Sequence, residues 1–224
     1  WLLHAPGLYD RPGNPYQDAA DKPWADAAEQ FAWLGWAAAL LGNGLDADWR
    51  PDVVHGHDWH AGLAFAYLRQ LVQGEGQRPA TVFTIHNLAY QGVFPASVRE
   101  RLGLPDALFH FNGLEYHGQV SFMKAGLKYS DAITTVSPTY AQEITGHEQG
   151  CGLDGVLRKR HSVLHGILNG VDNTVWNPAS DPLVQPGYDA DHLEGKAQAK
   201  ARLQKTMHLK PSKTRLLFCV VSRL

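Results

Sequence analysis

Four ionisable side chains are crowded into residues 55–60, within the stretch PDVVHGHDWHAGLAFA at residues 51–66. Three are imidazoles and one is a carboxylate: His55, His57, Asp58 and His60. Such groups can bind a metal ion, move protons or hydrogen-bond a polar ligand. This stretch is therefore the first place to look for chemistry.

The spacing of these side chains argues against a metal site. His55 and His57 could converge, because alternate residues of a strand share one face. However, residues 51–66 contain neither the HxxxH nor the HExxH spacing of helical zinc sites. Cys151 and Cys219 stand far apart without CxxC spacing, so they indicate neither a thiolate site nor a disulfide framework. We expect no metal ion or other cofactor, and we interpret His55 and His60 as hydrogen-bonded scaffold.

Other familiar catalytic patterns are also missing. There is no GxSxG nucleophile elbow and no GKS/T. The glycine-dense residues 150–155, GCGLDG, have the GxGxxG spacing but do not directly follow a predicted strand, so we do not interpret them as a phosphate loop. What remains is a polar crevice rich in His, Asn, Asp, Tyr and Trp. This mixture suits a carbohydrate, whose hydroxyl groups need many hydrogen-bond partners while its C–H faces pack on aromatic rings.

Neighbouring elements predict how the polar side chains are positioned. Val53 and Val54 indicate a buried strand, followed by a polar turn that carries the histidines and then a helix over residues 63–71. A second strand, residues 81–85, ends on the polar segment HNLAYQG at residues 86–92. Both polar clusters would then lie outside the carboxyl ends of parallel strands, where open α/β sheets bind ligands.

The remaining elements continue this alternation. Residues 26–41 predict an amphipathic helix with one apolar face formed by Phe31, Leu34, Ala38 and Leu41. Residues 73–76 end the helix predicted over residues 63–71, and residues 93–118 have no regular pattern. The other predicted strands are residues 1–3, 132–136, 163–168 and 216–221, and the other helices are residues 121–129, a helix opened by Ser137-Pro138, and residues 191–209. The order predicts an α/β fold with a Rossmann-like parallel sheet and flanking helices.

Composition narrows the classes of partner. The 224 residues are 44% hydrophobic, enough to bury a core, and 20 Lys and Arg nearly balance 22 Asp and Glu. No basic field favours nucleic acid, and no apolar run predicts a membrane span or a signal peptide. Two isolated cysteines fit a reducing, cytoplasmic location. Because both ends fall within predicted strands, we also expect an internal fragment.

Six sequence blocks together resemble the bacterial glycogen synthases and the related starch synthases. They are HDWHAGL (57–63), TIHNLAYQG (84–92), FMKAG (122–126), TVSPTY (135–140), GLDGVL (152–157) and LNGVD (168–172). The resemblance implies a GT-B glycosyltransferase, in which two Rossmann-like domains face each other across a cleft. Residues 1–170 would be a partial N-terminal, acceptor-side domain. Residues 171–224 would be a linker and the first elements of the truncated nucleotide-sugar-binding domain.

The resemblance also implies a reaction. Glucose would pass from a nucleotide sugar, ADP-glucose in most bacteria, to the nonreducing end of an α-1,4-glucan such as glycogen or a maltooligosaccharide, with retention and without a metal ion. By match to the family's blocks, Asp58 is the cleft carboxylate and His86 the histidine near the transferred glucose. Four further positions match substrate contacts: Tyr9, Asn87, Asn169 and Arg223. The guanidinium of the last suits a diphosphate.

Some features of the family are absent from this sequence. They include a Lys-x-Gly-Gly loop, a lysine five residues after Arg223, and the acidic and glycine motif that grips glucose and phosphate. We therefore expect the polypeptide alone to bind ADP-glucose poorly and not to turn over. Two alternatives stay open: another retaining GT-B transferase, such as a sucrose synthase relative, and a noncatalytic glucan-binding module. The blocks at 57–63 and 84–92 argue against the first.

Overall fold

A computed structural model describes residues 1–71 and 78–222, and the chain separates into two compact units, Trp1–Asn169 and Gly170–Leu224. The assignment of these parts to an acceptor-side domain and a nucleotide-sugar domain stays a prediction. The expected helix break at residues 73–76 lies outside the described residues, and so does Arg223, the predicted contact to the diphosphate.

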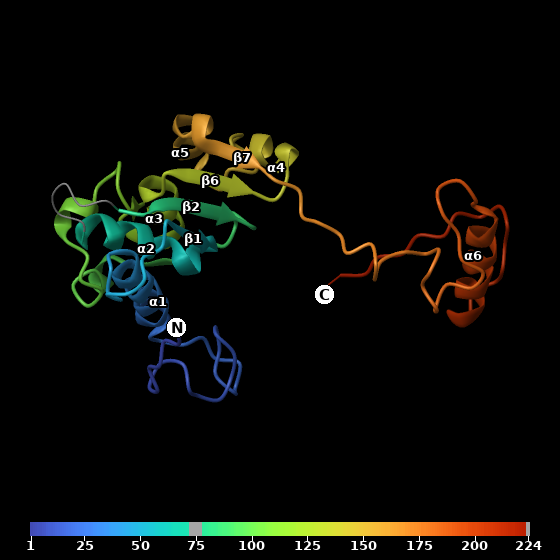
Figure 1. Cartoon of the computed structure of the whole chain (residues 1–224), viewed down its shortest axis with the longest axis horizontal. Helices are drawn as coiled ribbons and strands as arrows, with labels where there is room; N and C mark the ends of the chain where they lie inside the picture. Colours follow the sequence, from blue (N-terminus) through green and yellow to red (C-terminus); the bar gives the residue numbers. More distant parts are fainter. Residues whose placement is uncertain (72–77, 223–224) are drawn as a thin grey trace. The chain divides into compact units, whose positions relative to one another are not determined.

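The first unit is built on a four-stranded parallel sheet with the order β1-β2-β6-β7 (Figure 1). Its strands are β1 (Val53–His57), β2 (Ala80–Ile85), β6 (Ala132–Thr135) and β7 (Leu164–Gly166). Each strand overlaps a β-branched or apolar run that the sequence predicts to be a strand. The expected α/β class with a Rossmann-like parallel sheet is confirmed.

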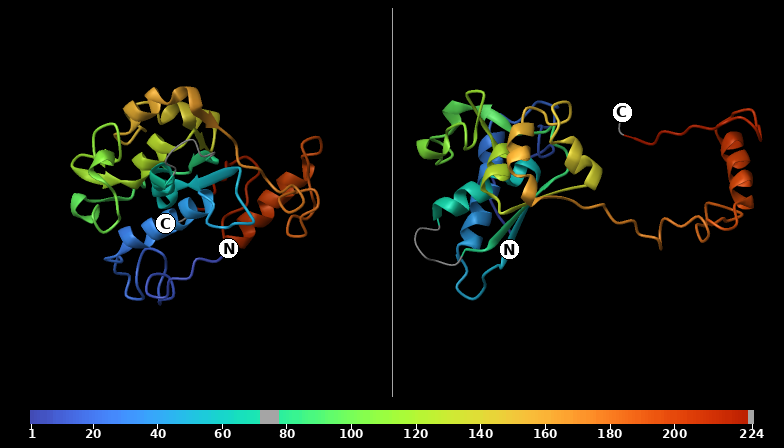
Figure 2. Two further views of the ribbon diagram at one scale, coloured as in Figure 1. Left: turned by 60° about the vertical axis from the view of Figure 1, so that its left-hand side comes forward. Right: turned by 90° about the horizontal axis from the view of Figure 1, so that it is seen from above.

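In the described part of this unit, five helices connect or flank these strands, and Figure 2 shows it from two further directions. They are α1 (Ala27–Gly42), α2 (Asp58–Leu71), α3 (Phe122–Tyr129), α4 (Pro138–Glu143) and α5 (Asp154–Lys159). A core of fully buried side chains, including Phe65, Phe83 and Leu127, joins α2 and α3 to β2. Among the described residues, no helix is both long and apolar enough to cross a lipid bilayer.

Close packing of α2 on α3 depends on Gly62. A Cβ at this position would lie 1.9 Å from the carbonyl oxygen of Phe122. On the other side of α2, α1 approaches through small residues, since a Cβ at Gly35 would lie 2.9 Å from the backbone nitrogen of Ala64. This contact corrects the predicted face of α1: Leu34 is 43% exposed, because close approach favours the small residues.

Residues 93–121 form a small antiparallel sheet with the order β3-β5-β4, where no element was predicted. Its strands are β3 (Val93–Pro95), β4 (Glu115–Tyr116) and β5 (Gln119–Ser121), accompanied by the 3-10 turns η1 (Ala96–Val98) and η2 (Asp106–Leu108). A third 3-10 turn, η3 (His161–Val163), precedes β7. Elements of two or three residues are too short for apolar periodicity to reveal.

Three further expectations are wrong. Residues 1–3 and 216–221 form no strand, because an apolar run becomes a strand only when it pairs with another one, and no described residue pairs with them. The predicted polar turn between residues 55 and 60 is also absent, since β1 runs through His57 and α2 begins at Asp58.

The second unit contains the helix α6 (Glu194–Thr206), within the predicted range 191–209.

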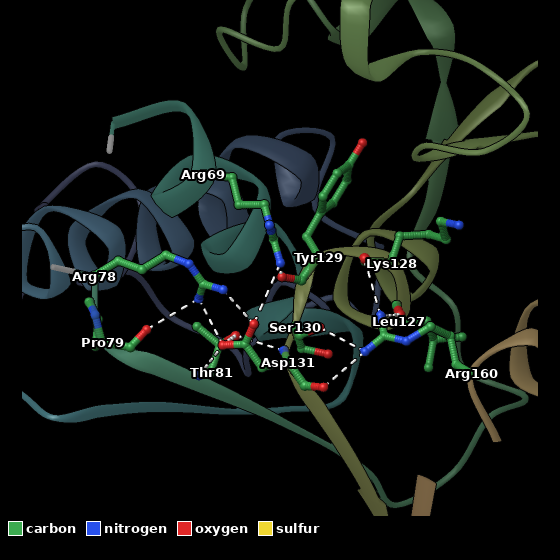
Figure 3. A network of polar contacts seen from close by, with 10 residues as sticks. All are labelled: Arg69, Arg78, Pro79, Thr81, Leu127, Lys128, Tyr129, Ser130, Asp131 and Arg160. Atoms are coloured by element: carbon green, nitrogen blue, oxygen red, sulfur yellow. Dashed lines mark hydrogen bonds and ion pairs between the residues drawn. The ribbon is translucent and has the colours of Figure 1, made fainter. Parts of the chain in front are cut away.

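The amino ends of β2 and β6 are tied together by the carboxylate of Asp131 (Figure 3). Arg78 donates two hydrogen bonds to it, at 2.7 and 2.5 Å, and Thr81 donates from both its backbone N–H and its hydroxyl at 2.8 Å. The Arg78 guanidinium lowers the pKa of Asp131. Nearby, Arg160 donates to the backbone carbonyls of Leu127 and Ser130, both at 2.8 Å. We call Asp131 with its partners Arg78 and Thr81 the Asp131 clamp, because these contacts hold the amino ends of β2 and β6 together.

Candidate active site

The opposite, carboxyl end of the sheet is organised by Asp58. The chain passes from β1 into α2 at this residue, which adopts a left-handed backbone conformation with φ of 54°. Aspartate tolerates this region better than most residues, because its short polar side chain can hydrogen-bond locally. The sharp turn places the carboxylate directly at the end of β1, without an intervening loop.

The carboxylate of Asp58 bridges β1 to the segment that follows β2. Its Oδ1 accepts a hydrogen bond from the backbone N–H of His86 at 2.8 Å and a longer one from that of Asn87 at 3.4 Å. The two strands are parallel neighbours, with His57 in register with Thr84. The structure therefore brings together three of the predicted site residues: Asp58, His86 and Asn87.

Histidine side chains continue this cluster along one face of the sheet. Nδ1 of His57 lies 3.0 Å from Nε2 of His86, so one imidazole donates a hydrogen bond and the other accepts it. Nε2 of His55 lies 2.7 Å from the hydroxyl of Thr84. Burial lowers the pKa of His55, and the neighbouring His57 and His86 lower it further. Within the described ranges, no three His, Cys, Asp or Glu side chains are grouped to hold a metal ion.

Trp59 makes a second link between the two polar segments. A Cβ at Gly92 would lie only 2.1 Å from the Trp59 ring, and Gly92 has φ of 56°, so both space and conformation require glycine here. The indole also stacks on the His60 ring, with centroids 4.1 Å apart. The segments at 57–63 and 86–92 are thus fixed to each other by the Asp58 carboxylate and by the Trp59 ring.

Residues that the sequence marked only as parts of motifs hold the segment after β2. The hydroxyl of Tyr140 accepts a hydrogen bond from the backbone N–H of Leu88 at 3.1 Å. The side chain of Gln91 donates to the carbonyl of Cys151 at 2.8 Å, which ties the glycine-dense loop to the same segment. Local sequence patterns could not have revealed these roles, because the hydrogen-bond partners lie about 50 to 60 residues apart in the chain.

Two tyrosines of the N-terminal loop have different surroundings. The hydroxyl of Tyr9, a predicted substrate contact, donates to the backbone carbonyl of Gln30 in α1 at 2.6 Å. The hydroxyl of Tyr16 instead lies 2.9 Å from Nε2 of His60, beside the Asp58 segment. The structure therefore places the Tyr16 side chain next to the Asp58 segment, whereas the Tyr9 side chain packs against α1.

Asn169 lies at the end of the first unit and is exposed. It follows β7, and directly after that strand the backbone N–H of Ile167 donates to the carbonyl of Thr135 at 2.8 Å. Because β6 lies between β7 and β2, Asn169 and His86 follow strands that are not neighbours in the sheet. Among the described residues, the hydrogen bonds of the Asp58 carboxylate go to His86 and Asn87 and not to Asn169.

The arrangement offers a fixed carboxylate and exposed imidazole and amide groups at one edge. Oδ1 of Asp58 is occupied by backbone N–H groups, whereas Oδ2 accepts no hydrogen bond from the described part of the chain. His86 and Asn87 are exposed beside it. Such an edge can bind hydroxyl groups and can stabilise positive charge that develops on a ligand.

The first unit is a Rossmann-like α/β domain, because it has a parallel sheet with flanking helices and exposed polar side chains at the carboxyl ends of its strands. The chain belongs to the starch synthase catalytic domain family, whose model matches residues 1–159. It is 57% identical over 224 residues to a glycogen synthase of Albidiferax ferrireducens and 52% identical over 226 residues to one of Francisella tularensis subsp. novicida. All of this chain is covered in both cases, but it spans only 45% and 46% of those relatives.

Solved structures agree with this assignment. The catalytic domain of starch synthase IV from Arabidopsis thaliana, bound to ADP and acarbose, matches with a TM-score of 0.65 and 32% identity. The match covers 84% of this chain and 38% of that one. The predicted resemblance to glycogen and starch synthases, and with it the GT-B type of fold, is confirmed.

Proposed function

We propose that the protein to which this chain belongs is a glycogen or starch synthase. It transfers glucose from a nucleotide sugar, ADP-glucose, to the nonreducing end of an α-1,4-glucan and retains the anomeric configuration. Family membership supports this reaction class, and the identities of 57% and 52% to glycogen synthases support the glucan acceptor.

The observation that carries the proposal is the link from the Asp58 carboxylate to the backbone of His86. In a retaining transfer, positive charge develops on the sugar as the diphosphate leaves. A carboxylate held rigidly at the sheet edge can stabilise that charge without rearrangement in the transition state. We assign this task, or the positioning of the acceptor, to Asp58.

The remaining predicted residues receive supporting roles. His86 contacts the transferred glucose through its side chain and its backbone carbonyl, and Asn87 hydrogen-bonds the same sugar. Asn169 and Tyr9 contact substrate from elements farther from the cluster, and Arg223 binds the diphosphate. Guanidinium groups and helix N-termini can carry the phosphate charge, so this scheme assigns no step to a metal ion.

Radioactive glucose incorporation tests the proposal. A full-length protein that carries this chain should transfer glucose from ADP-glucose to glycogen, and Asp58→Asn should lower kcat about 100-fold or more. Asparagine suits the left-handed backbone at this position and can still accept the His86 hydrogen bond. The exposed Asp52→Asn is the matched control and should be neutral. Unchanged turnover in Asp58→Asn would remove this carboxylate from the mechanism.

A further inference from the structure

A pocket with a volume of about 460 Å³ lies on the first unit, between α3, α5 and the segment that carries β4. Its lining comes from residues 111–117, from α3 and from residues 152–159. Asp58 and His86 are not among the lining residues, so the pocket is separate from the candidate active site. The volume falls within the 300–1,000 Å³ that is typical of sites for small molecules.

Positive charge gathers in this pocket. Lys124, Lys128 and Lys159 line it together with one carboxylate, that of Glu115. None of the three ammonium groups forms an ion pair in the described part of the chain. The Glu115 carboxylate itself accepts a hydrogen bond from the backbone N–H of Gly118 at 2.7 Å. Three ammonium groups against one carboxylate leave two positive charges in excess, and these attract an anion.

The surroundings of Lys128 show that this charge is not balanced locally. Burial lowers the pKa of the Lys128 ammonium, and the neighbouring Arg160 and Lys159 lower it further. Figure 3 shows the Lys128 side chain pointing away from the carboxylate of Asp131, which is bound by Arg78. An anion in the pocket would therefore relieve repulsion between cations.

Hydrogen bonds within the protein already hold the walls of the pocket. The Lys124 ammonium donates to the backbone carbonyl of Phe111 at 2.8 Å and to that of Glu115. The Tyr116 hydroxyl donates to the carbonyl of Cys151 at 2.9 Å, which joins the β4 segment to the glycine-dense loop. Walls that are fixed before a ligand arrives lower the entropic cost of binding.

One aromatic ring beside the lysines is available to a ligand. Phe111 is 76% exposed, although phenylalanine is usually a buried residue. The Lys124 ammonium lies 5.2 Å from the centroid of this ring, so the ring stays next to the positive charge. A ligand with a planar ring could pack on Phe111 while an anionic group reaches the lysines.

The excess charge also narrows the kind of anion. A phosphate monoester carries about 1.5–2 negative charges at neutral pH and has three strong acceptor oxygens, whereas a carboxylate carries one charge. The phosphate thus matches the two uncompensated positive charges, and lysine ammonium groups bind phosphate as point charges.

We propose that this pocket binds a small phosphate monoester whose organic part is a planar ring. The phosphate oxygens accept hydrogen bonds from Lys128 and Lys159, and the ring packs on Phe111. Lys124 adds charge and holds the wall. The site takes no part in the transfer reaction and does not depend on the proposed function.

Calorimetric titration of the 224-residue chain with phenyl phosphate tests the site, because this probe carries both parts of the proposed ligand. We expect saturable binding, with a Kd about tenfold or more below that of inorganic phosphate. The double variant Lys128→Met/Lys159→Met should weaken binding about tenfold or more. Lys22→Met/Lys210→Met removes two exposed lysines outside the pocket and is the matched control, which should change the Kd by less than about twofold.

A third variant separates the ring from the phosphate. Phe111→Ala should weaken binding of phenyl phosphate about fivefold or more, and it should change the Kd of inorganic phosphate by less than about twofold. Equal affinity of the parent chain for phenyl phosphate and inorganic phosphate would overturn the proposed ligand.

Thermal unfolding guards against a trivial loss of binding. Lys128→Met removes a charge that its neighbours repel, so this variant should be at least as stable as the parent chain. Absence of saturable phenyl phosphate binding, or binding that the double lysine variant leaves intact, would overturn the site. Either result leaves the transfer proposal standing, since that proposal depends on turnover and on Asp58.

Discussion

The carboxylate of Asp58 accepts its 2.8 Å hydrogen bond from the backbone of His86 and not from the imidazole. The two proposed catalytic residues are therefore linked in a way that does not depend on the His86 side chain. That side chain can be removed while the two strand ends stay connected. Chemical and structural contributions of His86 can thus be separated by mutation.

His86→Ala should lower kcat of a full-length enzyme that carries this chain by about 100-fold or more, the usual effect of one lost polar contact in the transition state. The unfolding temperature should change little, because His86 is exposed and its backbone bond to Asp58 remains. His147→Ala, another exposed histidine, is the control for a general effect of the substitution. Activity equal to that of the parent would return His86 to a purely structural role.

The imidazole of His57 should orient that of His86, since their nitrogen atoms are 3.0 Å apart. His57→Leu removes this partner, and we expect kcat to fall about tenfold, which corresponds to about 1.4 kcal/mol. His57→Gln keeps a group that can donate or accept and should restore part of the rate. If leucine and glutamine behave alike in steady-state kinetics, the hydrogen bond does not position His86.

Stability should fall as the pH decreases below about 6.5, the ordinary pKa of histidine. Burial lowers the pKa values of His55 and His60 in the folded chain, so the unfolded chain binds more protons in this range. Protonation therefore favours unfolding. Thermal unfolding between pH 7.5 and 5 should show this slope, and a His55→Gln/His60→Gln variant should flatten it. A slope unchanged in that variant would assign it to other groups.

The Asp131 clamp should matter for stability and not for catalysis. Asp131→Asn should destabilise the fold by about 1–3 kcal/mol, a range that allows for solvent screening of a side chain 36% exposed. Since the pKa of Asp131 is lowered, its contribution persists above about pH 3.8 and is lost as the pH falls below that value. The control is Asp106→Asn, whose ion pair with Arg99 is on the surface, with the carboxylate 94% exposed. Equal effects of both substitutions in urea unfolding would contradict the clamp.

Gly62 and Gly155 both lie in helices but should respond differently to alanine. A Cβ at Gly62 would clash with the Phe122 carbonyl at 1.9 Å, so Gly62→Ala should cost about 1–3 kcal/mol in overpacking. At Gly155 the nearest atom would be 3.8 Å away, so Gly155→Ala should be neutral or stabilising by about 0.5–1 kcal/mol. Urea unfolding of the two variants measures the difference, and equal destabilisation would show that α2 can move away from α3.

Sequence patterns predicted the long elements well, because helices and strands with a buried face carry a periodic signal. Ser137-Pro138, for example, opens α4 as expected, and the Ser137 side chain accepts the capping hydrogen bond from the Tyr140 N–H. The predicted apolar face of α1 failed at Leu34, since packing on α2 depends on how closely Gly35 lets the backbones approach. Hydrophobicity alone does not contain that information.

The candidate site was predictable only where it coincides with strand ends. Asp58 and His86 follow adjacent parallel strands, so their proximity could be inferred from the order of elements. The position of Tyr9 against α1, and the role of Gln91 in holding the glycine-dense loop, depend on contacts between distant parts of the chain. Neither composition nor spacing records such contacts.

The left-handed backbone at Asp58 also restricts how this position can change over time. Asparagine and glycine tolerate that conformation, whereas β-branched and bulky residues strain it. Both tolerated replacements are one nucleotide away from an aspartate codon, and both remove the charge. Asparagine also keeps an oxygen that can accept the His86 hydrogen bond, whereas glycine loses that link. With Asp58 in its proposed role, an aspartate-to-asparagine change would remove the reaction in a single step and keep the fold.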